Sequence, residues 1–172
     1  GFKLEYVRDK SGNDLSTTIN QTMMRINLKK PLLSGKTFII QIKWWYNIND
    51  RDEVGGRSGY EYFPKDDNYL YTIAQFYPRM AVYNEVEGWQ NKQFLGRGEF
   101  ALPFGDFKVN ITVPADHIVA STGTLTNMSK VLTSDQIKKW ELAKKESVQP
   151  VIIVSQEEAE KKEKIRSKEK KT

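Results

Sequence analysis

Along residues 1–125, hydrophobic and polar side chains alternate at the two-residue period of β-strands. Residues 2–8 (FKLEYVR) and 23–28 (MMRINL) show this alternation, and polar turn residues separate them. The strongest segment is 37–46 (TFIIQIKWWY), which is rich in β-branched and aromatic residues; its alternate positions from Phe38 to Trp44 form one apolar face. We therefore predict three strands here, each with one face turned toward a core.

Later segments continue the pattern after a long polar connection. Residues 47–68 are polar and glycine-rich, and we predict them as a loop. Further strands are predicted at residues 69–74, 81–83, 98–102, 107–113 and 118–125. No segment before Leu125 carries a 3.6-residue apolar stripe, so the predicted fold class is all-β with antiparallel connections.

The character of the sequence changes after residue 126. Residues 133–136 (TSDQ) form a capping-box pattern that predicts a short helix running to about Lys145. Residues 151–154 (VIIV) suit a brief strand, and residues 155–158 (SQEE) repeat the capping pattern before a highly charged stretch. The predicted domains are 1–155, a β domain with a helical insertion at about 129–147, and 156–172, a charged tail that is helical or disordered.

Composition excludes several classes of protein. The hydrophobic fraction of 38% is low, but aromatic residues reach 12% of the chain, and disordered chains lack such residues. The sequence has no cysteine and a single histidine, His117, which excludes disulfides, cysteine nucleophiles and an intrachain histidine zinc site. The net charge of +5 is too mild for a nucleic-acid footprint, and no apolar run approaches the ~20 residues of a membrane span. We therefore expect neither a nucleic acid nor a membrane as a partner. The sequence does not indicate the cellular location.

Three local patterns have plain structural interpretations. His117 follows Asp116 in a turn, and nothing in the sequence supplies a nucleophile for it to activate. Residues 55–59 (GGRSG) lack the spacing of a phosphate-binding loop. The acid pairs Asp50/Asp52 and Asp66/Asp67 lack EF-hand spacing. We interpret them as a turn, a connector and solvated loop charges; no residue of this chain is predicted to be catalytic or to bind a metal.

Aromatic residues gather around the predicted loop and leave one alternative open. Core packing explains most of them, because half the side chains of a strand face inward. A stand-alone carbohydrate- or peptide-binding β module is the alternative function. Its binding surface would come from this set: Trp44, Trp45, Tyr60, Tyr62, Phe63, Tyr69 and Tyr71.

An ordered set of short motifs in the middle of the chain resembles a known family. It begins with residues 72–83 (TIAQFYPRMAVY) and Gly88-Trp89. It continues with GEF at 98–100, FGDFKV at 104–109, ITVP at 111–114 and VASTGTL at 119–125. In this order the motifs resemble the amino-terminal β domain of the aminopeptidase N family of zinc metallopeptidases, the gluzincin aminopeptidases. The resemblance covers roughly residues 20–130.

The resemblance implies a fold and a role. The family's domain is a saddle-like antiparallel β-sandwich that rests on a separate catalytic domain carrying HExxH, a motif absent from this sequence. We therefore expect a non-catalytic domain fragment, incomplete at its start, whose partners are the parent's catalytic domain and a peptide substrate. Zinc is expected in that catalytic domain and no cofactor in this fragment.

One residue role follows from the same resemblance. The family places a Gln or Glu that binds the free α-amino group of the peptide, and motif order assigns this position to Gln75. An amide oxygen accepts hydrogen bonds, and an ammonium group donates them. The family's common form has another Gln two residues earlier, where this chain has Ile73.

Overall fold

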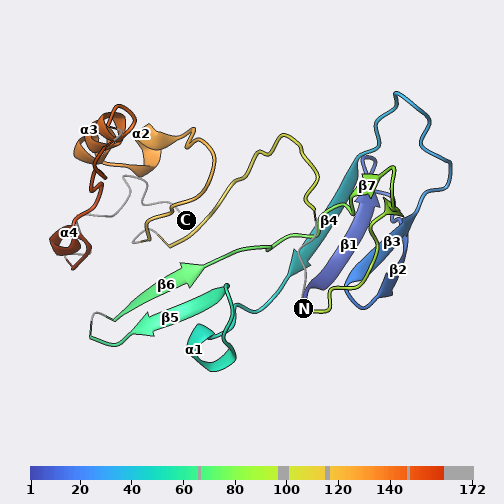
Figure 1. The fold of residues 1–172 in the computed structure, drawn as a ribbon, viewed down its shortest axis with the longest axis horizontal. Coiled ribbons are helices and arrows are strands. Elements are labelled where there is room, and N and C mark those ends of the chain that lie inside the picture. Colours follow the sequence, from blue (N-terminus) through green and yellow to red (C-terminus); the bar gives the residue numbers. More distant parts are fainter. Residues whose placement is uncertain (66, 97–100, 115–116, 147, 161–172) are drawn as a thin grey trace. The chain divides into compact units, whose positions relative to one another are not determined.

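The structure is a computed structural model that describes residues 1–65, 67–96, 101–114, 117–146 and 148–160. The chain divides into two compact units, residues 1–106 and 107–172. Every described strand belongs to the first unit, and helices α2 to α4 belong to the second (Figure 1). Strands predominate over short helices, which confirms the predominantly β class.

The first sheet joins two segments that are distant in sequence. Strand β1 (Lys3–Asp9) pairs antiparallel with β4 (Ile40–Trp45). On β4 the predicted alternation is confirmed, because even-numbered residues are half-buried and odd-numbered residues exposed. Val7 on β1 lies opposite Ile42 and is only 8% exposed. Apolar pairing across these two strands forms the most buried part of the unit.

The second sheet is a tight hairpin whose turn is hydrogen-bonded to the side chain of a residue distant in sequence. Strand β2 (Ser16–Asn20), which the sequence did not predict, pairs with β3 (Met23–Asn27), which it did. The Gln93 carboxamide oxygen accepts from the backbone N–H and the hydroxyl of Thr22, at 3.0 and 2.6 Å. Its amide nitrogen donates to the Asn20 carbonyl at 2.9 Å. One distant side chain thus satisfies three polar groups of the turn.

Residues 47–68 are not a plain loop, so that prediction was wrong. They contain helix α1 (Arg51–Val54) and strand β5 (Gly59–Phe63), which pairs antiparallel with β6 (Asn68–Thr72) (Figure 1). The Asp50 side chain caps α1. Flanking glycines and charges obscured the short alternation of β5.

Most of the strands predicted in residues 81–125 are not observed in the described residues. A two-residue strand β7 (Tyr83–Asn84) pairs with β8 (Gly88–Trp89). The structure assigns no strand to residues 107–113, 118–125 or 151–154, so these predictions were wrong. Residues 98–100 lie outside the described residues. A strand requires a hydrogen-bonded neighbour, and alternation in one segment does not supply it.

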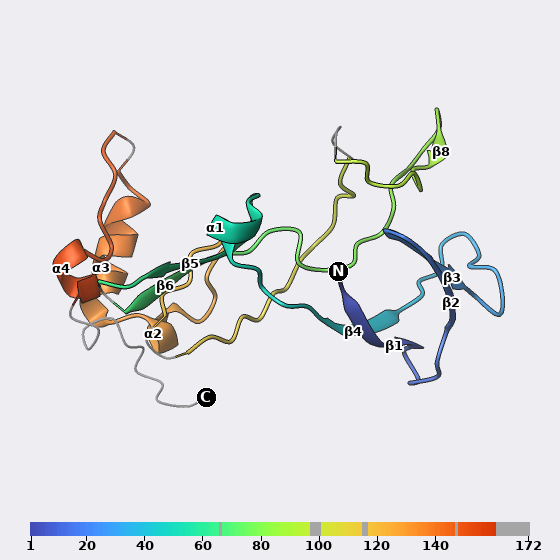
Figure 2. The same ribbon diagram turned by 90° about the horizontal axis from the view of Figure 1, so that it is seen from below.

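Two helices of the second unit, α3 and α4, begin where capping patterns predict, whereas α2 has no side-chain cap. Helix α2 (Met128–Val131) precedes α3 (Ser134–Ala143), and α4 (Gln156–Glu160) follows (Figure 2). The predicted capping box is confirmed: the Thr133 hydroxyl accepts from Gln136 N–H, and the Gln136 side chain accepts from Thr133 N–H. This reciprocal pairing leaves Gln136 only 4% exposed.

A second reciprocal cap starts α4. The Ser155 hydroxyl accepts from Glu158 N–H at 3.2 Å, and the Glu158 carboxylate accepts from Ser155 N–H at 2.9 Å. These bonds, together with Lys139, lower the pKa of Glu158. The rest of the predicted tail, residues 161–172, lies outside the described residues.

Within the described residues, strands form four separate two-stranded sheets. Val7 is the only buried hydrophobic residue among them, and many large apolar side chains are exposed. Paired sheets of this kind bury little apolar surface by themselves. The sandwich arrangement and the predicted domain boundary at residue 155 stay predictions.

Candidate functional site

Gln75 lies in a turn three residues beyond the end of β6. Its backbone φ is +51°, in the left-handed region that residues other than glycine rarely occupy. Its side chain is exposed. Strained backbone of this kind persists only where the surroundings hold it, and it is concentrated at functional sites.

Hydrogen bonds hold the chain on both sides of Gln75. On one side, the Ser58 hydroxyl accepts from the Ala74 N–H at 3.1 Å and donates to the Ala74 carbonyl at 3.3 Å. On the other, the Trp44 indole N–H donates to the Phe76 carbonyl at 2.9 Å. The turn is therefore fixed to β4 and to the residue that precedes β5.

Trp44 itself is positioned by aromatic contacts. Its ring meets the Phe2 ring edge-on at 6.4 Å, and Phe2 meets Tyr46 at 5.5 Å. Burial raises the pKa of Tyr46. Edge-to-face pairs of this type restrict ring orientation, so the indole donor has a defined direction.

The Gln75 carboxamide makes no hydrogen bond to any described residue of the chain. It offers a carbonyl oxygen as acceptor and an NH₂ group as donor. An ammonium group can donate to that oxygen, and a peptide carbonyl can accept from that nitrogen. The carboxamide can therefore accept from a donor and donate to a carbonyl, and it supplies no nucleophile, acid or base.

Four tyrosines form a second feature, which we call the tyrosine face: Tyr60, Tyr62, Tyr69 and Tyr71. Register places Tyr60 opposite Tyr71 and Tyr62 opposite Tyr69, so all four share one side of the β5–β6 hairpin. These residues belong to the aromatic set predicted from the sequence, but their pairing was not predicted. The repeated YEY and YLY segments around a polar turn were the signal that could have revealed it.

Carboxylates adjoin both ends of the tyrosine face. The Tyr62 hydroxyl donates to Asp67 at 3.1 Å, and this bond raises the pKa of Tyr62. The charge of Asp50, followed by burial and a hydrogen bond to Asp50, raises the pKa of Tyr60. Both shifts favour the neutral form of the phenol.

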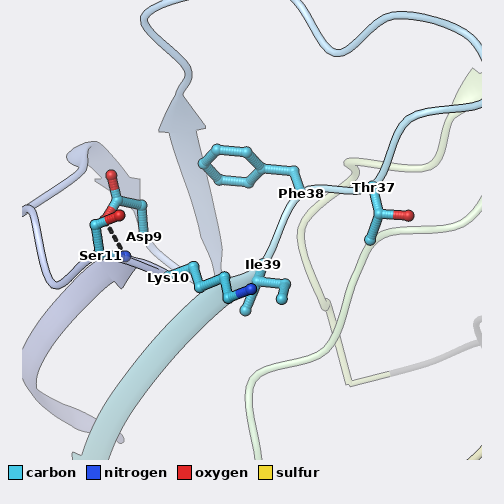
Figure 3. A pocket seen from close by; sticks show the side chains of 6 residues that line it. All are labelled: Asp9, Lys10, Ser11, Thr37, Phe38 and Ile39. Carbon is cyan, nitrogen blue, oxygen red and sulfur yellow. Dashed lines mark hydrogen bonds between the residues drawn. The ribbon is translucent and has the colours of Figure 1, made fainter.

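A shallow cavity of about 380 Å³ lies beside the end of β1 (Figure 3). Asp9, Lys10, Ser11, Thr37, Phe38 and Ile39 line it. The Asp9 carboxylate is occupied by the turn itself, because it accepts from the backbone N–H groups of Ser11 and Asn13 at 2.8 and 2.9 Å. Figure 3 shows the Lys10 side chain reaching along Ile39. We see no acid–base pair in this cavity.

The remaining polar patterns can be followed where the structure describes them, and the Asp50/Asp52 pair departs from the predicted solvated loop charges, because Asp50 is half-buried and Asp52 lies in α1. His117 N–H donates to the Pro114 carbonyl at 3.0 Å. Asp50 caps α1 through Asp52 N–H at 2.9 Å, and Gly55 ends that helix. Asp66 lies outside the described residues. No group of three or more His, Cys, Asp or Glu side chains in the described part could hold a metal ion.

Comparisons with known proteins found no matching family model, no matching curated protein and no matching solved structure. Within the described ranges, no helix combines the length and hydropathy needed to cross a membrane.

Proposed function

We propose that this chain is the non-catalytic amino-terminal β domain of a zinc aminopeptidase, in which Gln75 binds the free amino group of the peptide. The observation that carries the proposal is the exposed Gln75 on a left-handed turn that Ser58 and Trp44 anchor on either side. The identity of the ligand, the free amino group of a peptide, comes from the motif resemblance around Gln75. A carboxamide held in this way selects an ammonium by position as well as by chemistry.

The proposed domain acts as a wall of the peptide cleft. It would complete a saddle-like β-sandwich against the parent's catalytic domain, which would cover part of the exposed apolar surface described above. By binding the peptide's amino end, Gln75 would favour substrates with an exposed terminus over internal segments, because an internal segment leaves its hydrogen bond unmade. The chain would contribute binding and not bond cleavage.

The zinc ion belongs to the catalytic domain in this proposal. The described residues offer no group of ligands that fits it, and the sequence has a single histidine and no cysteine. A reading frame that encodes HExxH downstream of residue 172 would support the domain assignment. A complete gene product without such a motif would contradict it.

Substitution of Gln75 to alanine in the parent peptidase tests the site. A hydrogen bond to a charged group contributes about 1.5–3 kcal/mol, so we expect KM for peptides with a free amino terminus to rise roughly ten- to hundredfold. Gln21→Ala is the matched control, because Gln21 is also exposed at φ +51° in a turn. Equal KM values for the Gln75 variant and the parent would remove the role of Gln75.

A stand-alone carbohydrate- or peptide-binding module is the second candidate function. The tyrosine face favours it, because exposed aromatic rings on one side of a hairpin suit ligand contact. Titration of the isolated chain with oligosaccharides, followed by tryptophan fluorescence, separates the two functions. Saturable quenching would support the module, and an unchanged spectrum would favour the peptidase domain.

A further inference from the structure

The rings of the tyrosine face are in mutual contact, and three of the four residues are exposed, while Tyr60 is half-buried. Tyr62, Tyr69 and Tyr71 are 43%, 45% and 42% exposed. Ring centroids lie 4.7 Å apart for Tyr62 and Tyr69, 5.9 Å for Tyr60 and Tyr69, and 6.4 Å for Tyr60 and Tyr71. Cross-strand and diagonal packing of this kind stabilises the hairpin and leaves the outer ring surfaces available to a ligand.

The orientations of these rings do not make one flat platform. Tyr69 and Tyr71 lie nearly parallel, at 22°, but the other three pairs are inclined by 35° to 63°. A flat ligand contacts several rings at once only when they are coplanar. A cation has no such requirement, because each ring face attracts it separately through the quadrupole.

The electrostatic surroundings of the rings are negative. Asp67 contacts the Tyr62 hydroxyl at 3.1 Å, and Asp50 and Glu53 act on Tyr60. Residues 49–72 contain six acidic and three basic side chains, a net charge of −3, whereas the whole chain carries +5. One of the three basic residues, Arg51, is paired with Glu61, which alternation places on the opposite side of β5.

From this combination we infer that the tyrosine face binds a basic peptide segment, whose Lys or Arg side chains lie over the rings between Asp50 and Asp67. The aromatic surface removes the aliphatic stems from water, and the carboxylates attract the charged heads. This surface operates independently of Gln75 and of the parent peptidase. Charge complementarity identifies the occupant, because an acidic aromatic surface on an otherwise basic chain attracts a positively charged peptide.

Binding of a hexa-arginine peptide to the full 172-residue chain, measured by isothermal titration calorimetry, tests the inference. We expect saturable binding that weakens with salt, and none for hexa-glutamate. A cation–π contact at an exposed site contributes about 0.5–1 kcal/mol, so Tyr69→Leu and Tyr71→Leu should each weaken binding roughly two- to fivefold. Tyr69→Phe keeps the ring and should change the affinity less than twofold.

Two further variants keep the test decisive if a leucine variant fails to fold. Asp50→Asn retains a good helix cap and removes a charge, so it should lower the affinity and the salt dependence. Tyr83→Leu removes an exposed ring on β7, outside the tyrosine face, and should leave the affinity unchanged.

Two results of these titrations would overturn the inference. Binding of hexa-arginine that is insensitive to every tyrosine-face variant would show non-specific attraction and overturn the inference. Binding of cellohexaose without binding of hexa-arginine would overturn it in favour of a carbohydrate site. An unchanged KM for Gln75→Ala in the parent peptidase would not affect the hexa-arginine result, because the two tests use different residues and ligands.

Discussion

The indole N–H of Trp44 donates to the carbonyl of Phe76 at 2.9 Å, across 32 positions of sequence. This bond joins strand β4 to the turn that presents Gln75. On β4, the same residue faces the half-buried side and meets the ring of Phe2. A core-facing aromatic residue therefore also sets the conformation of the candidate binding turn.

Substitution of Trp44 by phenylalanine removes the donor and keeps an aromatic ring. We expect a loss of about 1 kcal/mol in the free energy of unfolding, since the Phe76 carbonyl loses its partner. Amide hydrogen exchange at Gln75 and Tyr77 should become faster than in the unaltered chain. Urea denaturation and exchange measured by NMR check both expectations.

Trp45→Phe is the control for that variant, because Trp45 is exposed on the other side of β4. It should change neither the unfolding free energy nor exchange at the turn. If the two variants lose equal protection at Gln75, the Trp44 hydrogen bond does not hold the turn.

Gly59 opens strand β5 at a point where a side chain has no room. A Cβ atom there would lie 2.8 Å from the Asn49 carbonyl oxygen and 3.0 Å from the Arg51 Cβ, and φ is +157°. We expect Gly59→Ala to lower the unfolding free energy by roughly 1–3 kcal/mol and to weaken the pairing of Tyr60 with Tyr71. Urea denaturation and cross-strand NMR contacts measure these effects.

Gly56→Ala provides the comparison, because Gly56 also has a positive φ, +102°, but nothing within 4 Å of the added atom. It should cost less than Gly59→Ala. An equal or larger cost at Gly56 would mean that backbone strain, and not the close approach to Asn49, makes Gly59 necessary.

Asp9 gives the turn after β1 a defined pH dependence. Hydrogen bonds from Asn13, first from its side chain and then from its backbone, lower the pKa of Asp9 below its ordinary value of 3.8. A carboxyl group whose pKa is lowered by folding stabilises the folded turn fully above pH 3.8. That stabilisation is lost as the pH falls through the lowered pKa.

An NMR titration of the Asp9 carboxyl group should therefore give a midpoint below 3.8, and the amides of Ser11 and Asn13 should lose protection over the same range. Asp9→Asn removes the titrating group, so protection at these amides should no longer follow that transition. A midpoint at or above 3.8 would contradict the hydrogen-bonded turn.

The fold was predictable where a segment carried its own signal. Strand β4 has strict alternation with β-branched and aromatic residues, and helix α3 has a reciprocal cap, Thr133 with Gln136; both were predicted and observed. Residues 107–113 alternate as well, yet they form no strand, because alternation does not provide a hydrogen-bonding neighbour. Strand β5 was missed because glycines and charges surround only five residues.

The candidate site was predictable to a smaller extent. Gln75 came from the order of motifs around it, but nothing in the sequence indicated that Ser58 and Trp44 anchor its turn. The aromatic residues of the tyrosine face were visible, while their register was not. A shift of one residue in that register would send the tyrosines to opposite sides of the hairpin.

The sequence by itself determined the β character of the first unit, the helix caps of the second and the exclusion of cysteine chemistry. Each of these depends on residue type or on interactions within a few positions of the chain. Tertiary structure alone decided that Trp44 meets Phe76, that Gln93 clamps the β2–β3 turn, and that four tyrosines share one surface. These features require segments distant in sequence to take a particular register, which local patterns do not specify.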